Sequence, residues 1–184
     1  MVQAPALTRP QTLDQFLDWE PTDGYKYEWN DGELIRFSGM KKKQYYIYDV
    51  LNSLFIEQGY HRLGTFMAEP DVMLTAIQIR RPDITYFTKA QIQRGRNGED
   101  VLPGFVVEIL SETDQAYRVE EKLTEYFKAG VQVIWNIISE QEVVYVYTSR
   151  RQVVICLEDD ICSAAPVLPD FTISVNELFA LPTT

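Results

Sequence analysis

The sequence predicts an α/β fold with a mixed β-sheet flanked by helices, and three observations support this prediction. Short runs rich in β-branched and aromatic residues recur along the 184-residue chain. Two longer segments, residues 43–58 and 117–130, carry apolar residues at helical spacing. No repeat, low-complexity tract or linker separates these segments. We therefore expect residues 1–184 to form a single domain around one core.

The N-terminal third is expected to contain two helices and a hairpin. Residues 12–20 predict a short helix, because Thr12 is a suitable N-cap and apolar residues follow on one helical face. Residues 25–39 predict a hairpin whose turn, residues 30–32, reads Asn-Asp-Gly. The helix at 43–58 follows.

The middle of the chain predicts strands and a loop. Strands are expected within 62–75 and at 83–87, joined by a turn near 76–78. Residues 88–103 are polar and contain glycine, which predicts a mobile loop.

The C-terminal half begins with "FVVEILS", residues 105–111, which predicts a strand buried on both faces. The helix at 117–130 ends at Gly130, a favourable C-cap. Ser174 and Glu177 form a capping box that begins a short final helix. Three further strands are expected at 131–139, 142–149 and 152–158.

Composition excludes several classes of function. The net charge of −10 argues against a protein that coats nucleic acid non-specifically. The single histidine, His61, excludes histidine-rich zinc sites, and neither a P-loop nor a dinucleotide fingerprint occurs. No segment is apolar enough to span a membrane, and the first residues lack a signal-peptide layout. We read Cys156 and Cys162 as reduced thiols and expect a cytoplasmic protein.

A carboxylate in the middle of the apolar strand raises the question of function. Glu108 needs a partner or a role, since an unpaired buried charge is costly. Asp83 begins another strand directly after a proline, and Lys122 borders the apolar stripe of the helix that follows Glu108. By the same helical phase, Glu121 and Glu125 are expected to face solvent. We therefore expect two carboxylates and a lysine at one sheet edge.

Such a trio suits metal-assisted hydrolysis of phosphodiesters, because carboxylates bind hard ions such as Mg²⁺. The spacing alone leaves a structural alternative open, in which Asp83 caps a turn and Lys122 only pairs with Glu108. A two-carboxylate glycoside hydrolase fits less well, since it gives Lys122 no role.

Several motifs, taken in order, resemble a family described as putative restriction endonucleases, in the PD-(D/E)XK nuclease superfamily. They are "YEWNDGELIRFSG", "RRPD", "FVVEILS", "ETD", "EKLTEYFKAGV", "VIWNII" and "VLPDFTISVNELF". The resemblance extends over nearly the whole chain. It implies a restriction-endonuclease-like fold with a mixed central sheet, and a metal-dependent nuclease active on DNA.

The resemblance also implies roles for individual residues. Asp83 matches the acid of the PD motif, in preference to Asp71 in a second Pro-Asp pair, and Glu108 matches the second acid. Leu110 stands where the superfamily has its usual lysine, and Lys122 on the next helix matches the lysine of this family. The backbone carbonyl of Ile109 would be a further metal ligand.

Three other positions also bear on the site. Asp114 matches a common family acid or is a helix N-cap. Glu33 matches a recurrent "DGE" and would supply the superfamily's additional acid, or it is exposed beside the turn. Gln44 stands where many relatives carry histidine, a departure that favours a degenerate enzyme.

The sequence thus predicts a Mg²⁺-dependent DNA endonuclease, with Mn²⁺ as a substitute, that forms a homodimer. The alternative is a catalytically inactive nuclease fold that binds nucleic acid or a protein partner. Basic residues are expected to surround the cleft and contact DNA phosphates. The candidates are Lys41, Lys42, Lys43, Arg80, Arg81, Arg94 and Arg96.

Overall fold

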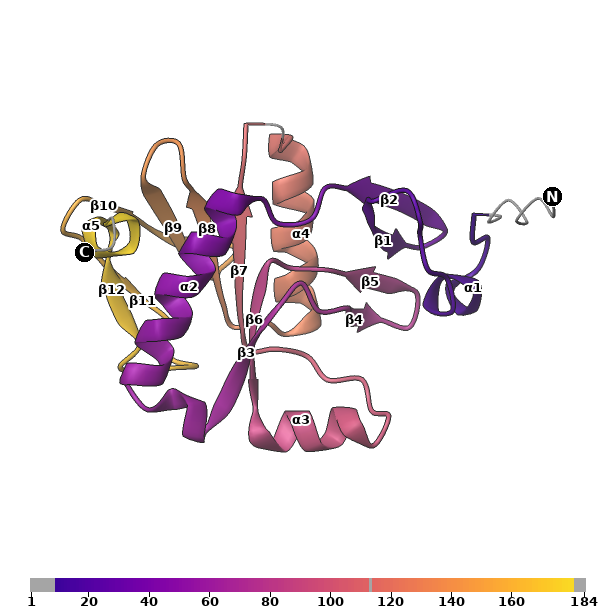
Figure 1. The fold of residues 1–184 in the computed structure, drawn as a ribbon, viewed down its shortest axis with the longest axis horizontal. Helices are drawn as coiled ribbons and strands as arrows, with labels where there is room; N and C mark the ends of the chain where they lie inside the picture. The colour runs from indigo at the N-terminus through magenta and orange to yellow at the C-terminus, as the bar shows by residue number, and fades with distance from the viewer. Residues whose placement is uncertain (1–8, 113, 181–184) are drawn as a thin grey trace, which may run out of the picture.

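The computed structural model describes residues 9–112 and 114–180, and its centre is a six-stranded mixed sheet (Figure 1). The strand order is β10-β9-β8-β7-β6-β3. From one edge to the other the strands are β10 (Gln152–Leu157), β9 (Val143–Ser149), β8 (Val133–Ile138), β7 (Phe105–Leu110), β6 (Ile84–Thr88) and β3 (Gly64–Ala68). The predicted mixed sheet is therefore confirmed.

The parallel pair at the middle of this sheet follows from one crossover. β7 and β8 run parallel, while the other neighbouring strands are antiparallel. A parallel pair needs a long connection, and α4 (Ala116–Ala129) supplies it. Gly130 ends α4 in the left-handed conformation, at φ 116°, in agreement with the predicted C-cap.

Helices cover both faces of the sheet. The α2 helix (Lys42–Glu57) and the short α5 helix (Val175–Phe179) pack on the face that carries Val107 and Ile109. The α4 helix packs on the opposite face, against Val106. Glu108 alternates with Val107 and Ile109, so its side chain points toward α4.

A smaller antiparallel sheet lies alongside α4 (Figure 1). Its order is β2-β1-β5-β4, and α1 (Leu13–Leu17) packs against it. The strands are β1 (Lys26–Asn30), β2 (Glu33–Phe37), β4 (Val72–Thr75) and β5 (Gln78–Arg80). The predicted hairpin and the Thr12 N-cap, which accepts a hydrogen bond from the Gln15 amide, are both confirmed.

The prediction for residues 62–88 is partly wrong. The turn near 76–78 joins β4 to β5, whereas we expected it to lead to the strand at 83–87. The short β5 strand was missed because three residues carry too little periodicity to identify a strand. A 3₁₀ turn at Tyr60–Arg62 precedes β3.

The predicted loop at 88–103 is also wrong in its first half. Residues Lys89–Arg96 form helix α3. Thr88 and Gln91 make a capping box, and the Gln91 side chain also donates to the Leu102 carbonyl at 2.6 Å. These hydrogen bonds stabilise a mostly polar helix, in which Ile92 packs against the core.

A small two-stranded sheet that the sequence did not indicate, β11 (Ile161–Ser163) with β12 (Thr172–Ser174), precedes α5. The Ser174–Glu177 capping box before α5 is confirmed. Both cysteines are buried free thiols. None of the described helices is long and apolar enough to span a bilayer.

Candidate active site

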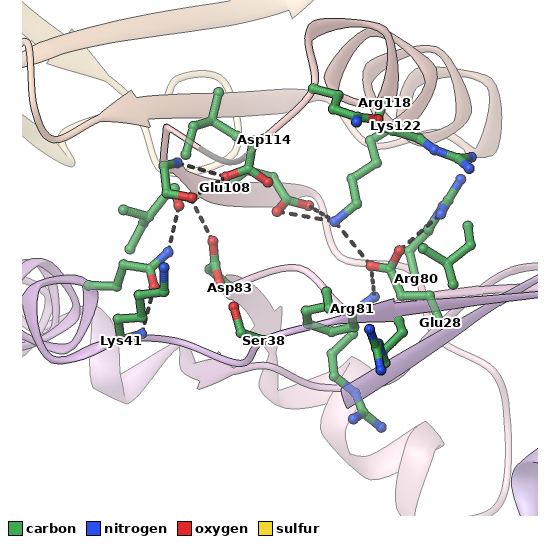
Figure 2. Close-up of a pocket in the computed structure, with 18 of the residues that line it drawn as sticks. Glu28, Ser38, Lys41, Arg80, Arg81, Asp83, Glu108, Asp114, Arg118 and Lys122 are labelled. Carbon is green, nitrogen blue, oxygen red and sulfur yellow. Dashed lines mark hydrogen bonds and ion pairs between the residues drawn. The ribbon is translucent and has the colours of Figure 1, made fainter. Parts of the chain in front are cut away.

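A polar cleft of about 470 Å³ opens where β7 ends, between the first turns of α2 and α4 and the smaller sheet. Asp83, Glu108 and Lys122 all line it (Figure 2). Asp83 directly precedes β6, and its Oδ2 accepts a hydrogen bond from the Ile109 amide at 2.7 Å. This bond connects Asp83 to the strand that carries Glu108, so the sequence-predicted trio does converge.

Lys122 lies between two buried carboxylates. Its Nζ is 3.3 Å from Glu108 Oε1 and 3.0 Å from Glu28 Oε1. The Tyr126 hydroxyl, one helical turn further along α4, donates to Glu108 Oε1 at 2.6 Å. Glu108 is therefore held by two side chains of the same helix, with its position fixed from the α4 side of the sheet.

Sequence reasoning missed Glu28 and Tyr126. Glu28 is only 1% exposed in the middle of β1, and it accepts from the Arg81 amide as well as from Lys122. A carboxylate inside "YKYEWN" is the same signal as the one in "FVVEILS" and could have found Glu28. Tyr126 is four residues after Lys122 and therefore on the same helical face, but we assigned it only to the core.

Arg80 is buried and paired with carboxylates, which contradicts the expectation that it contacts DNA. It is 1% exposed, and its guanidinium reaches Glu28 at 2.9 Å and Glu125 at 2.7 Å. Glu121 lies 3.6 Å away. The expectation that Glu121 and Glu125 simply face solvent is also wrong, because Arg80, the last residue of β5, lies against their side of α4.

Burial and mutual repulsion shift the pKa values of the two predicted metal ligands. Burial, together with the charge of Glu108, raises the pKa of Asp83 to about 8. Burial also raises the pKa of Glu108, although the nearby Lys122 opposes the shift. Two carboxylates that disfavour each other's charge favour a cation between them.

Lys122 is held as a cation in the metal-free protein. Burial alone lowers its pKa, but the charges of Glu108 and Glu28 outweigh burial and raise it. The charges of Lys122 and Arg80 likewise outweigh burial at Glu28 and lower the pKa of that carboxyl group. An ammonium with a raised pKa donates hydrogen bonds and does not accept a proton at neutral pH.

The donor set fits a hard divalent cation. Within the described ranges, no group of three or more His, Cys, Asp or Glu side chains is arranged to hold a metal. Two carboxylates and a backbone carbonyl are nevertheless the oxygen ligands that Mg²⁺ uses, with water completing its shell. The Ile109 carbonyl already accepts a hydrogen bond from Gln44 Nε2 at 2.6 Å, so one of its two lone pairs is engaged.

The two remaining acidic candidates have structural partners. Asp114 Oδ2 accepts from the amide and hydroxyl of Ser111, which fixes the turn after β7 at the cleft wall. The N-cap of α4 is Gln115 and not Asp114. Glu33 does not line the cleft and pairs with Arg118 at 2.9 Å on the rim.

The remaining basic candidates divide into three groups. Lys41 and Arg81 line the cleft, and Arg81 also pairs with Asp71. Lys42 and Lys43 are exposed in the first turn of α2. Arg94 and Arg96 lie on α3, which begins where β6 ends, so the whole strand separates them from Asp83 (Figure 1). Neither lines the cleft, which contradicts their placement at its mouth.

The fold and the cleft together define an α/β protein of the nuclease-like class. The family model described as putative restriction endonuclease, Uma2, matches residues 13–176. The chain belongs to this family.

One solved structure is similar over almost its whole length. It is described as a putative nuclease belonging to DUF820 from Anabaena variabilis ATCC 29413. The two chains are 27% identical, the alignment covers 92% of this chain and 98% of that one, and the TM-score is 0.71. A search of curated proteins found no match.

Proposed function

We propose that this chain is a Mg²⁺-dependent endonuclease that hydrolyses phosphodiester bonds in DNA. The observation that carries the proposal is the convergence of Asp83, Glu108 and Lys122 in one polar cleft. Membership of a nuclease family supports the reaction class. We further propose that residues 1–184 act as one domain, because Lys122 and Arg80 join the smaller sheet to α4 through buried ion pairs. Its proposed location is the cytoplasm.

Each cleft residue has a distinct proposed role. Asp83, Glu108 and the Ile109 carbonyl would hold the ion. When bound, Mg²⁺ polarises the phosphate and lowers the pKa of a water molecule. Lys122 contributes as an ammonium: it offsets phosphate charge and orients the attacking water, while its raised pKa argues against a role as general base. Tyr126 and Glu28 hold Glu108 and Lys122 in position.

The direct test is incubation of the purified protein with linear, circular and single-stranded DNA, with Mg²⁺, with Mn²⁺ and with a chelator. Cleavage of circular DNA that requires a divalent cation supports an endonuclease. The absence of cleavage for every DNA form and both metals would refute it.

Lys122→Ala is expected to lower the cleavage rate by roughly 10²- to 10³-fold, the effect of removing one preorganised donor. Metal binding should persist, because neither carboxylate ligand is altered. Single-turnover cleavage and Mn²⁺ calorimetry measure the two quantities separately. Lys128→Ala, on the last turn of the same helix, is the matched control and should behave as wild type. A wild-type rate for Lys122→Ala would remove Lys122 from the mechanism.

Replacing Lys41, Lys42 and Lys43 by Gln is expected to weaken binding to all DNA sequences about equally. The plot of log affinity against log salt should flatten by about one unit for each phosphate that these lysines no longer neutralise. Fluorescence anisotropy at several salt concentrations measures this slope. All variants carry Glu108→Gln as well, so that the DNA is not cleaved during the measurement. Changing Arg94 and Arg96 to Gln, at the far end of β6, should leave the slope unchanged. The opposite pattern would place the DNA surface at α3.

The second candidate function is a nuclease fold that binds DNA or a protein without cutting. The Gln44 hydrogen bond to the Ile109 carbonyl favours it, because that carbonyl is a proposed metal ligand. Calorimetry distinguishes the two candidates: DNA binding without any Mg²⁺ or Mn²⁺ binding would support the second.

A further inference from the structure

The outer edge of β10 is open. β10 pairs with β9 on one side, and no described strand pairs with its other side. Alternate backbone N–H and C=O groups of such a strand face outward, ready to pair with another chain. Figure 1 shows β10 at the end of the sheet opposite to β3, far from the hairpin β1–β2.

The side chains of β10 are unusually apolar for an exposed edge. Four of its six residues are large hydrophobics between 45% and 61% exposed: Val153, Val154, Ile155 and Leu157. On the neighbouring strand, Tyr145 and Tyr147 stack and pair with Ile155 and Val153. At the opposite edge of the sheet, β3 has no large hydrophobic exposed to this degree. Protected edges normally carry a charge or proline within the strand, and β10 has neither.

Charges instead lie at the two ends of this strand, in a self-complementary order. The segment "RRQVVICLED" begins with Arg150 and Arg151 and ends with Glu158 and Asp159. Both arginines lie in the turn before β10, and both acids lie in the turn after it, Glu158 at φ 50°. A two-fold axis through Val154 or Ile155 therefore brings the basic turn of one copy toward the acidic turn of the other. Opposite charges on facing strands stabilise the pair in either register, and like charges would oppose it.

We propose that β10 pairs with β10 of a second copy of this chain, antiparallel about a two-fold axis. The backbone groups at the edge become paired, the exposed Val, Ile and Leu side chains gain cross-strand neighbours on the partner's β10, and the end charges favour the antiparallel alignment. Arg150 already pairs with Glu120 at 2.9 Å, while Arg151 and Glu158 make no ion pair among the described residues.

The proposed dimer leaves each cleft within one subunit. β10 is antiparallel to β9, β9 to β8, and β8 is parallel to β7, so β10 and β7 run in the same direction. The two-fold axis reverses β7 in the partner. The two clefts, each at the carboxyl end of its β7, would therefore open at opposite ends of the joined sheet, and the dimer does not depend on the proposed nuclease activity.

Charge reversal tests this arrangement, with mass measured by sedimentation and light scattering at several concentrations. The wild type is expected to be dimeric. Variant one carries Arg150→Glu with Arg151→Glu, and variant two carries Glu158→Lys with Asp159→Lys. Each should be monomeric, because in a dimer of either variant like charges would face each other. Mixed in equal amounts, the two variants should form a heterodimer, since every facing pair then has opposite charges. Val154→Lys should also give a monomer.

The matched control reverses the same number of arginines on α3, Arg94→Glu with Arg96→Glu, and should stay dimeric. A monomeric wild type would overturn the proposal. So would a dimer that persists in both charge-reversed variants, because its interface would then lie elsewhere. Failure of the mixture to form a heterodimer would exclude the antiparallel two-fold geometry. Circular dichroism of each variant verifies that it is folded.

Discussion

Asp83→Asn and Glu108→Gln are each expected to abolish cation-dependent DNA cleavage and to remove metal binding in calorimetry. Each change deletes one carboxylate of a two-carboxylate site, and a neutral amide is a poor ligand for Mg²⁺. The fold should survive. Asn at 83 retains an oxygen that accepts the Ile109 amide, and it removes the free-energy cost of keeping the buried Asp83 carboxyl protonated at neutral pH, below its raised pKa of about 8. The thermal midpoint of Asp83→Asn without metal should therefore equal or exceed that of wild type.

The second Pro-Asp pair provides a matched control for Asp83. Asp71 also follows a proline, but it does not line the cleft and pairs with Arg81 instead. Asp71→Asn should retain metal binding and cleavage. Cleavage by Asp83→Asn at the wild-type rate would point to a contaminating nuclease or another site. Loss of metal binding in Asp71→Asn would instead mean that Asp71 belongs to the metal site.

Arg80→Met is expected to destabilise the protein by about 3–5 kcal/mol, because it takes the buried cation away from Glu125 and leaves Glu28 with Lys122 alone. Glu28 is almost completely buried, and Glu125 is 16% exposed, so water cannot replace Arg80. Each kcal/mol lowers the midpoint of thermal unfolding by about 2–4 °C for a domain of this size. Calorimetric or urea unfolding therefore detects the change readily.

The neighbouring arginine is the control for this stability effect. Arg81 makes one ion pair with Asp71, which is half exposed, and such pairs contribute about 0–1 kcal/mol. Arg81→Met should consequently unfold close to the wild-type temperature. Equal midpoints for Arg80→Met and Arg81→Met would mean that Glu28 and Glu125 accommodate the change, and that the buried cluster contributes little to folding.

Local signals were sufficient wherever one segment determined the outcome. Apolar spacing predicted α2 and α4, the Asn-Asp-Gly turn predicted the first hairpin, and Ser174 with Glu177 predicted the start of α5. Strand alternation also predicted that Glu108 and Val106 share one face of their strand, and helical phase predicted that Lys122 points toward the sheet. These results depend on residues close in sequence, whose periodicity directly sets which side chains face the same way.

Only the tertiary structure decided what the buried charges contact. The sequence marks Arg80, Glu125 and Glu28 as charged, and an arginine beside the PD motif suggests a DNA contact. The structure pairs Arg80 with Glu125, 45 residues away, and with Glu28, 52 residues away. Similarly, α3 is placed at the end of β6 remote from Asp83. Local sequence sets a side chain's type and phase, but burial and pairing depend on which distant segment packs against it, and no local pattern encodes that.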